Sequence, residues 1–100
     1  MFASVIIPVL NEAEQIEETI VSVLREYSPK DVEVIVVDGG STDGTCDVIP
    51  DDVKLIHGPR GRAVQMNTGA REARGDILIF CHADTMLPAG WLEAVRTALS

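Results

Sequence analysis

A chain of 100 residues is long enough for one small domain, and its hydrophobic content of 46% is ordinary for a packed core. The 16 acidic and 8 basic residues give a formal net charge of −8, which excludes nucleic acid as an expected partner because a polyanion would be repelled. Four arginines form a local basic group: Arg60, Arg62, Arg71 and Arg74. They are either the solvated face of a helix or a site for a small anion such as a diphosphate.

The first third of the chain predicts a strand followed by a helix. Ser4 to Leu10 is hydrophobic and β-branched, which is typical of a buried strand, and Pro8 lies near its end. In residues 11–27 hydrophobic side chains recur at spacings of three and four, after Asn11 as the expected N-cap. We therefore expect an amphipathic helix that ends before Ser28 and Pro29.

Strands and helices continue to alternate through the rest of the chain. The expected elements are strands over residues 32–37, 53–58 and 76–81, a short helix to about residue 49, and helices over residues 62–74 and 87–100. This alternation predicts an α/β fold with a parallel sheet whose strands are buried on both faces, in one domain over residues 1–100. We expect His57 to be a structural strand residue, and Leu78, Phe80 and Trp91 to belong to the core.

The cysteines and the chain start carry information about the compartment. Cys46 and Cys81 lie far apart without CxxC spacing, so neither a zinc site nor a disulfide framework is indicated. Both thiols are expected to be reduced, which favours a cytoplasmic location. The chain start has no basic region, and no stretch approaches the roughly 20 apolar residues of a membrane span, so we expect no export signal or membrane segment.

Polar residues follow three of the expected strands. Asn11 and Glu12 follow the first strand, Asp38 the second, and His82 with Asp84 the fourth. Ligands of open parallel sheets bind beyond the carboxyl ends of the strands, so these side chains predict a binding site at one sheet edge. A purely structural role is the alternative: Asn11 could be the cap of a helix, and Asp38 could stabilise a turn.

Several common motifs are absent. The segment "GGSTDGT" lacks a glycine at Ser41 for a GxGxxG fingerprint, and Thr45 and Cys46 stand where a P-loop needs Lys and Ser or Thr. The chain also contains no HExxH motif, no nucleophile elbow and no Cys/His spacing typical of a metal site.

Three stretches of the sequence resemble the family 2 glycosyltransferases: "VIIPVLNEAEQIEETI", "VIVVDGGSTDGT" and "GRAVQMNTGAREARGDILIFCHADT". The resemblance covers nearly the whole chain, and "VDGGSTDGT" is its most diagnostic part. It implies a Rossmann-like GT-A fold with helices on both faces of a mainly parallel sheet, and a nucleoside-diphosphate sugar as donor. The chain would be the N-terminal, donor-binding part of a single GT-A domain whose sheet is incomplete.

The resemblance also implies roles for individual residues. Pro8, Asn11 and Glu12 would lie against the nucleotide, and Asp38 would hydrogen-bond the base or the ribose. Arg60 and Arg62 would line the same pocket, where the alternative is a solvated helix face.

The family's Asp-x-Asp motif corresponds here to His82, Ala83 and Asp84. Asp84 keeps the position of the ligand for a divalent metal, Mn²⁺ or Mg²⁺, while His82 and Ala83 would face the nucleotide. His82 departs from the family pattern. Its imidazole could bond a ribose hydroxyl or a phosphate oxygen, could ligate Mn²⁺, or could be a structural histidine satisfied by a backbone carbonyl.

By the same resemblance, the reaction is transfer of a sugar to an acceptor hydroxyl with inversion, assisted by the metal. The general base is expected beyond Ser100, so we expect these 100 residues alone to be inactive. One alternative is a non-catalytic nucleotide-binding module or an inactive fragment, whose exposed sheet edge would drive self-association. A nucleotidyltransferase of related fold would need a glycine-rich basic loop after the first strand, and "PVLNEAEQ" offers none.

Overall fold

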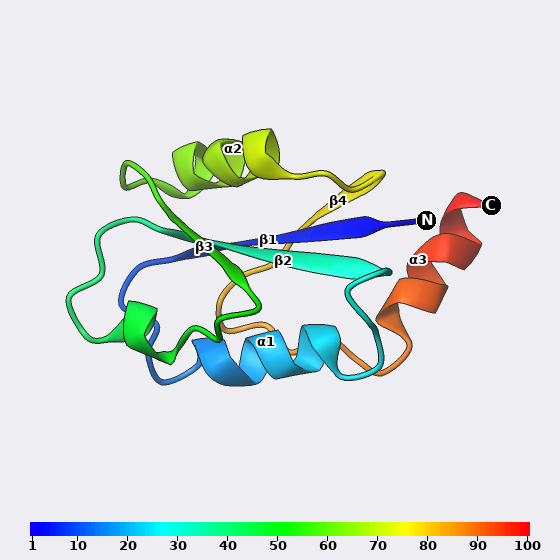
Figure 1. Cartoon of the computed structure of the whole chain (residues 1–100), viewed down its shortest axis with the longest axis horizontal. Helices are drawn as coiled ribbons and strands as arrows, with labels where there is room; N and C mark the ends of the chain where they lie inside the picture. Colours follow the sequence, from blue (N-terminus) through cyan, green and yellow to red (C-terminus); the bar gives the residue numbers. More distant parts are fainter.

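Four parallel strands form one sheet in the computed structural model, which describes residues 1–100. In spatial order the sheet runs β3-β2-β1-β4, so the first two strands of the chain occupy its centre (Figure 1). The prediction of an α/β fold with a parallel sheet is confirmed. The strands are β1 (Ala3–Val9), β2 (Val32–Asp38), β3 (Lys54–His57) and β4 (Ile77–Phe80).

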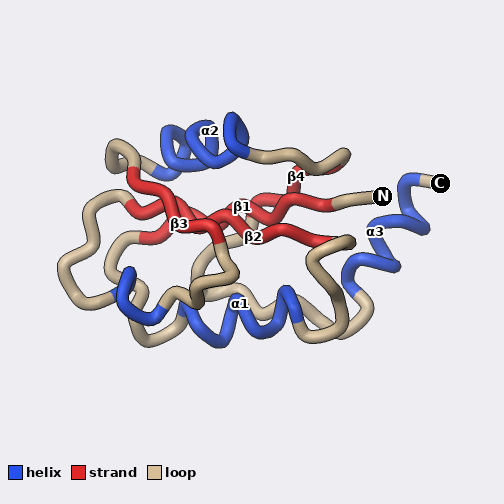
Figure 2. The backbone as a smooth tube through the Cα atoms, viewed as in Figure 1, coloured by secondary structure: helices blue, strands red, loops and turns tan.

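Helices cover both faces of this sheet. In Figures 1 and 2 helix α2 lies on one side of the strands and helix α1 on the other, with α3 beside the C-terminus. No helix of the structure is both long enough and apolar enough to span a bilayer. The helices are α1 (Ile16–Leu24), the 3-10 helix η1 (Thr45–Val48), α2 (Arg62–Glu72) and α3 (Trp91–Leu99).

The core is split by the two central strands. Every residue of β1 except Pro8 is buried, and its side chains alternate between two hydrophobic clusters. The larger cluster packs under α1, where Ile16, Ile20 and Val23 are buried. The smaller cluster lies on the other side of the sheet, and partly buried alanines of the α2 region pack against it. Because β1 and β2 are buried on both faces, their sequences read as unbroken hydrophobic runs.

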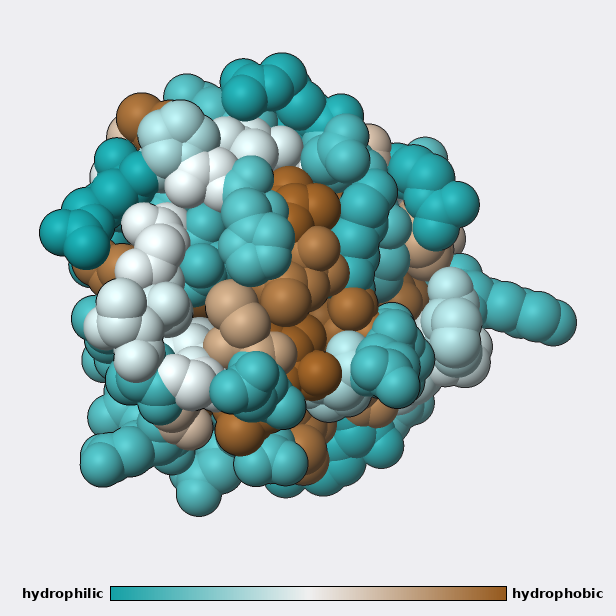
Figure 3. Space-filling view, turned by 60° about the vertical axis from the view of Figure 1, so that its left-hand side comes forward, coloured by the Kyte–Doolittle hydropathy of each residue, from teal (hydrophilic) through white to brown (hydrophobic).

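The edge strands differ from the expectation of full burial. Leu78 is 40% exposed and Phe80 is 47% exposed, so their predicted place in the core is wrong, whereas Trp91 is buried as predicted. Ile77 and Ile79 of β4 point to the opposite face and pack against the larger cluster. Side chains of a strand alternate in direction, and the outer face of β4 is left open here. Hydrophobic surface is also visible in Figure 3, as a band bordered by hydrophilic residues.

Helix α1 begins four residues later than predicted. Asn11 has a left-handed φ of 55° and does not cap the helix, so its predicted N-cap role is wrong. Its side-chain Oδ1 instead accepts a hydrogen bond from the Thr42 N–H at 2.8 Å. The segment before the helix is held against the loop that follows β2, where the Glu12 N–H also donates to the Thr45 hydroxyl at 2.9 Å.

Candidate functional site

A cleft of about 440 Å³ opens at the carboxyl ends of β1 and β4, beside the start of α2. All but two of the predicted nucleotide- and metal-binding residues line it, the exceptions being Asn11 and Asp38. The position therefore agrees with the general rule for ligand sites in parallel sheets. The lining consists of Pro8, Val9, Leu10, Glu12, Arg60, Gly61, Arg62, Gln65, His82, Ala83 and Asp84.

Charged side chains of both signs line this cleft without pairing with one another. Arg60, Arg62, Glu12 and Asp84 make neither an ion pair nor a side-chain hydrogen bond with the rest of the chain, and the imidazole of His82 has no partner either. The arginines present donors that suit phosphate oxygens, and the carboxylates present oxygen ligands that suit a hard cation. The cleft can thus receive an anionic group together with a metal ion.

The turn that carries His82 and Asp84 is fixed by helix α1. The Thr19 hydroxyl donates a hydrogen bond to the Ala83 carbonyl at 2.5 Å, and the Ser22 hydroxyl accepts one from the Leu87 N–H at 3.0 Å. Ala83 is buried, while the residues on either side of it are exposed along the cleft. A buried alanine between two polar residues therefore holds both polar side chains on the solvent side.

Gln65 of α2 is a site residue that sequence reasoning missed. Its amide is 3% exposed, and Nε2 donates to the carbonyl of Val9 at 3.0 Å and to that of Val37 at 2.9 Å. Its Oε1 accepts from the Gly61 N–H at 3.1 Å. One side chain thus ties the ends of β1 and β2 to the loop that carries the two arginines. The available signal was a polar residue one helical turn before Gly69, on the face of α2 that packs on the sheet.

Asp38 lies outside the cleft lining, at the end of β2. The residue is 3% exposed, and its carboxylate accepts hydrogen bonds from the backbone N–H groups of Gly40 at 3.0 Å and Ser41 at 3.2 Å. Asn11 braces the same loop, because its N–H donates to the Ser41 hydroxyl at 2.9 Å. Both residues, predicted to contact the nucleotide, here hold the loop that follows β2.

Hydrogen bonding controls the ionisation of Asp38. Burial would raise the pKa of this carboxyl group, but the hydrogen bonds from Ser41 and Gly40, with His57 beside them, outweigh burial and hold the pKa below its ordinary value. The pKa values of Asp31, Glu33 and Asp43 are lowered as well. The folded chain therefore favours the charged form of several carboxylates.

We expect the free energy of unfolding to fall as the pH drops below about 4. A carboxyl group whose pKa is lowered by folding stabilises the fold fully above its unfolded pKa, and this contribution is lost as the pH falls through the folded pKa. Urea unfolding at a series of pH values measures the decline, which should be shallower in Asp38→Asn. An equally steep decline in that variant would show that Asp38 is not one of the responsible groups.

Comparison with known proteins identifies the family of this chain. Residues 4–100 match the family described as Glycosyl transferase family 2. The chain belongs to glycosyl transferase family 2. A relative within it, the glycosyltransferase AglE of Haloferax volcanii, is 38% identical over an alignment that covers 99% of this chain and 36% of AglE.

Solved structures of similar proteins show the same fold. Staphylococcus aureus TarS (residues 1–349) superposes with a TM-score of 0.86 at 24% identity, over 97% of this chain and 32% of the TarS chain. The mannosyltransferase PcManGT of Pyrobaculum calidifontis, solved in complex with GDP-Man and Mn²⁺, superposes with a TM-score of 0.76 at 36% identity, over 87% of this chain and 28% of that protein. The family member described here has the expected GT-A fold and spans about a third of the length of these proteins.

Proposed function

We propose that this chain is the donor-binding part of a glycosyltransferase that transfers a sugar from a nucleoside-diphosphate sugar to an acceptor hydroxyl, with inversion. The observation that carries the proposal is the unpaired set of charges in the cleft at the strand ends. A diphosphate needs cationic donors, and a metal on that diphosphate needs a carboxylate beside them. Family membership and the GDP-Man bound in PcManGT support the same ligand class.

Different side chains of the cleft would contact different parts of the donor. Arg60 and Arg62, at the start of α2, would bond the oxygens of the diphosphate. Pro8 and Glu12, at the end of β1, would lie against the nucleoside. His82 would bond a ribose hydroxyl or a phosphate oxygen through an imidazole that has no partner in the chain.

Asp84 is the residue we assign to a divalent cation. Mg²⁺ and similar hard ions are commonly held by one or two carboxylates together with substrate phosphates, and the cleft offers the unpaired carboxylates of Asp84 and Glu12 together with arginines that suit the phosphates. PcManGT was solved in complex with GDP-Man and Mn²⁺, which supports a divalent cation in the donor site. When bound, the ion would offset the negative charge that develops on the leaving diphosphate.

The acceptor side of the reaction calls for a general base that we do not assign to any of these residues. We therefore propose that residues 1–100 alone bind the donor but transfer no sugar. The competing function is a nucleotide-binding module without catalysis. Incubation of the whole protein with radiolabelled sugar nucleotides and a range of acceptor extracts separates the two, since only the enzyme transfers label.

Binding of the nucleotide is tested directly by calorimetry with UDP and GDP in the presence of Mn²⁺. We expect Asp38→Ala to weaken the binding of the preferred nucleotide by about 1–3 kcal/mol, the value of a hydrogen bond to a charged group. The loss would arise from a missing contact to base or ribose, from a displaced loop after β2, or from both. Affinity equal to that of the wild type would exclude Asp38 from the donor site.

A further inference from the structure

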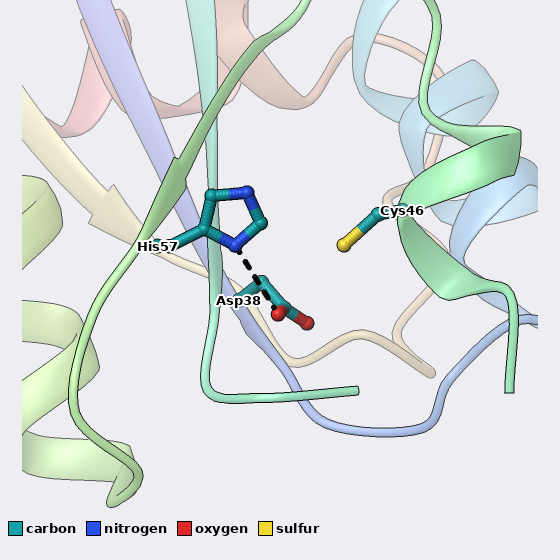
Figure 4. Close-up of side chains that lie close together, drawn as sticks. All are labelled: Asp38, Cys46 and His57. Atoms are coloured by element: carbon teal, nitrogen blue, oxygen red, sulfur yellow. Dashed lines mark ion pairs between the residues drawn. The ribbon is translucent and has the colours of Figure 1, made fainter. Parts of the chain in front are cut away.

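Three side chains with metal-ligating atoms meet beside the loop that follows β2 (Figure 4). Asp38 ends β2, His57 ends β3 and Cys46 belongs to η1. One ligand atom from each residue lies within 4.8 Å of the other two, and His57 Nδ1 is 3.4 Å from Asp38 Oδ2. Figure 4 shows the imidazole nitrogen and the sulfur both turned toward the carboxylate. None of the three residues lines the donor cleft.

We propose that Asp38, Cys46 and His57 form a Zn²⁺ site. A thiolate, an imidazole and a carboxylate are the ligand types of zinc, and three protein ligands with a water molecule complete its tetrahedral shell. The sulfur and nitrogen ligands disfavour Mg²⁺ and Mn²⁺, which prefer oxygen. This site is therefore chemically distinct from the carboxylate position at Asp84.

The three ligand atoms lie near the separations that zinc requires, at most 4.8 Å apart. Metal–ligand bonds of about 2.0–2.3 Å place the atoms of a tetrahedral shell roughly 3.3–3.8 Å apart. The His57–Asp38 separation of 3.4 Å already falls in this range. The imidazole can move, because the His57 side chain is 69% exposed, and Cys46 is only partly buried.

The carboxylate is already oriented by its own hydrogen bonds. Gly40 and Ser41 donate their N–H groups to Asp38, as outer-shell partners commonly do for ligating residues. Such partners hold a ligand in position before the metal arrives, so the site loses little freedom on binding. Zinc would bind the same carboxylate that holds the loop after β2.

The local charge favours a cation. The carboxylates of Asp38, Asp43 and Asp47 lie close enough to the Cys46 sulfur to act on it electrostatically. They make its surroundings negative, which attracts a cation, and a bound cation holds the sulfur as a thiolate after its proton has passed to solvent. Sequence analysis does not predict this site, because its ligands come from three separate elements and not from one CxxC-type motif.

The test is metal binding to the whole protein, first stripped with a chelator. We expect Zn²⁺ binding by calorimetry, and with Co²⁺ in its place the charge-transfer absorption of a cobalt–thiolate bond. Cys46→Ser should abolish that absorption and weaken Zn²⁺ binding at least about tenfold, and His57→Asn should weaken Zn²⁺ binding to a similar degree. His57 is an exposed side chain, so its replacement leaves folding intact even if the cysteine variant is impaired.

Two further variants serve as controls. Cys81→Ala removes the other cysteine, which is buried and outside the cluster, and should leave the Co²⁺–thiolate band unchanged. Asp84→Asn removes the carboxylate of the donor cleft and should leave this Zn²⁺ site occupied. The proposal is overturned if Cys46→Ser and His57→Asn bind Zn²⁺ as the wild type does, or if the cobalt band follows Cys81. Neither outcome depends on nucleotide binding, so the test is independent of the proposed function.

Discussion

Replacing Asp84 by Asn should abolish metal-dependent binding of nucleoside diphosphates almost completely. The substitution keeps the size of the side chain but removes the charged oxygen that a hard cation requires. The Asp84 carboxylate has no other partner in the chain, so the change should not disturb the fold. The loss should exceed the roughly 10- to 100-fold that removal of an outer-shell partner costs. Titrations of UDP and GDP with Mn²⁺ or Mg²⁺, followed by calorimetry, measure it.

His82 provides the matched comparison in the same turn. If the imidazole only contacts ribose or phosphate, His82→Asp should be tolerated because it restores the acid of the family's usual motif, and His82→Ala should cost more. If His82 is itself a ligand, His82→Asp should shift the metal preference from softer ions toward Mg²⁺. Wild-type affinity and metal response in Asp84→Asn would instead place the metal elsewhere or show that binding needs none.

The sequence was sufficient for the order of elements and for the centre of the sheet. Strands β1 and β2 are buried on both faces, so their hydrophobic runs are unambiguous. It failed at the edge of the sheet and at the first helix boundary. Leu78 and Phe80 are as hydrophobic as core residues, yet β4 has an open face that no periodicity can reveal. At the late start of α1, Asn11 Oδ1 accepts a hydrogen bond from the Thr42 N–H, a contact between two segments that come together only in the folded chain.

The candidate site was predictable where residues follow strands directly. Glu12, His82 and Asp84 were placed at the strand ends by topology alone, and all three line the cleft. Residues that act through tertiary contacts were not predictable in this way. Cys46 belongs to no recognisable motif, and the sequence predicts His57 to be a structural strand residue, yet the fold brings both side chains to Asp38.

Gln65 offers the clearest test of how the cleft is held together. We expect Gln65→Leu to lower the free energy of unfolding by about 2–4 kcal/mol, because buried polar groups that lose their partners are costly. Leu is close to Gln in size, so packing is retained while the carbonyls of Val9 and Val37 and the Gly61 N–H lose their bonds. Urea unfolding measures the stability, and calorimetry should show weaker nucleotide binding because the arginine loop is no longer tied to the strands.

Gln15 is the other glutamine of the chain and supplies the matched control. It is exposed, and its side chain makes no capping bond, so Gln15→Leu should change stability by no more than about 0.5 kcal/mol. Gln65→Glu keeps the acceptor for Gly61 but sets a carboxylate against two carbonyl oxygens, so it should be destabilising at neutral pH. Protonation would restore one donor, and stability relative to the wild type should then recover in acid. If Gln65→Leu were as stable as Gln15→Leu, the bonds to Val9 and Val37 would contribute nothing to the fold, and the arginines would have to be positioned by the backbone of their own loop.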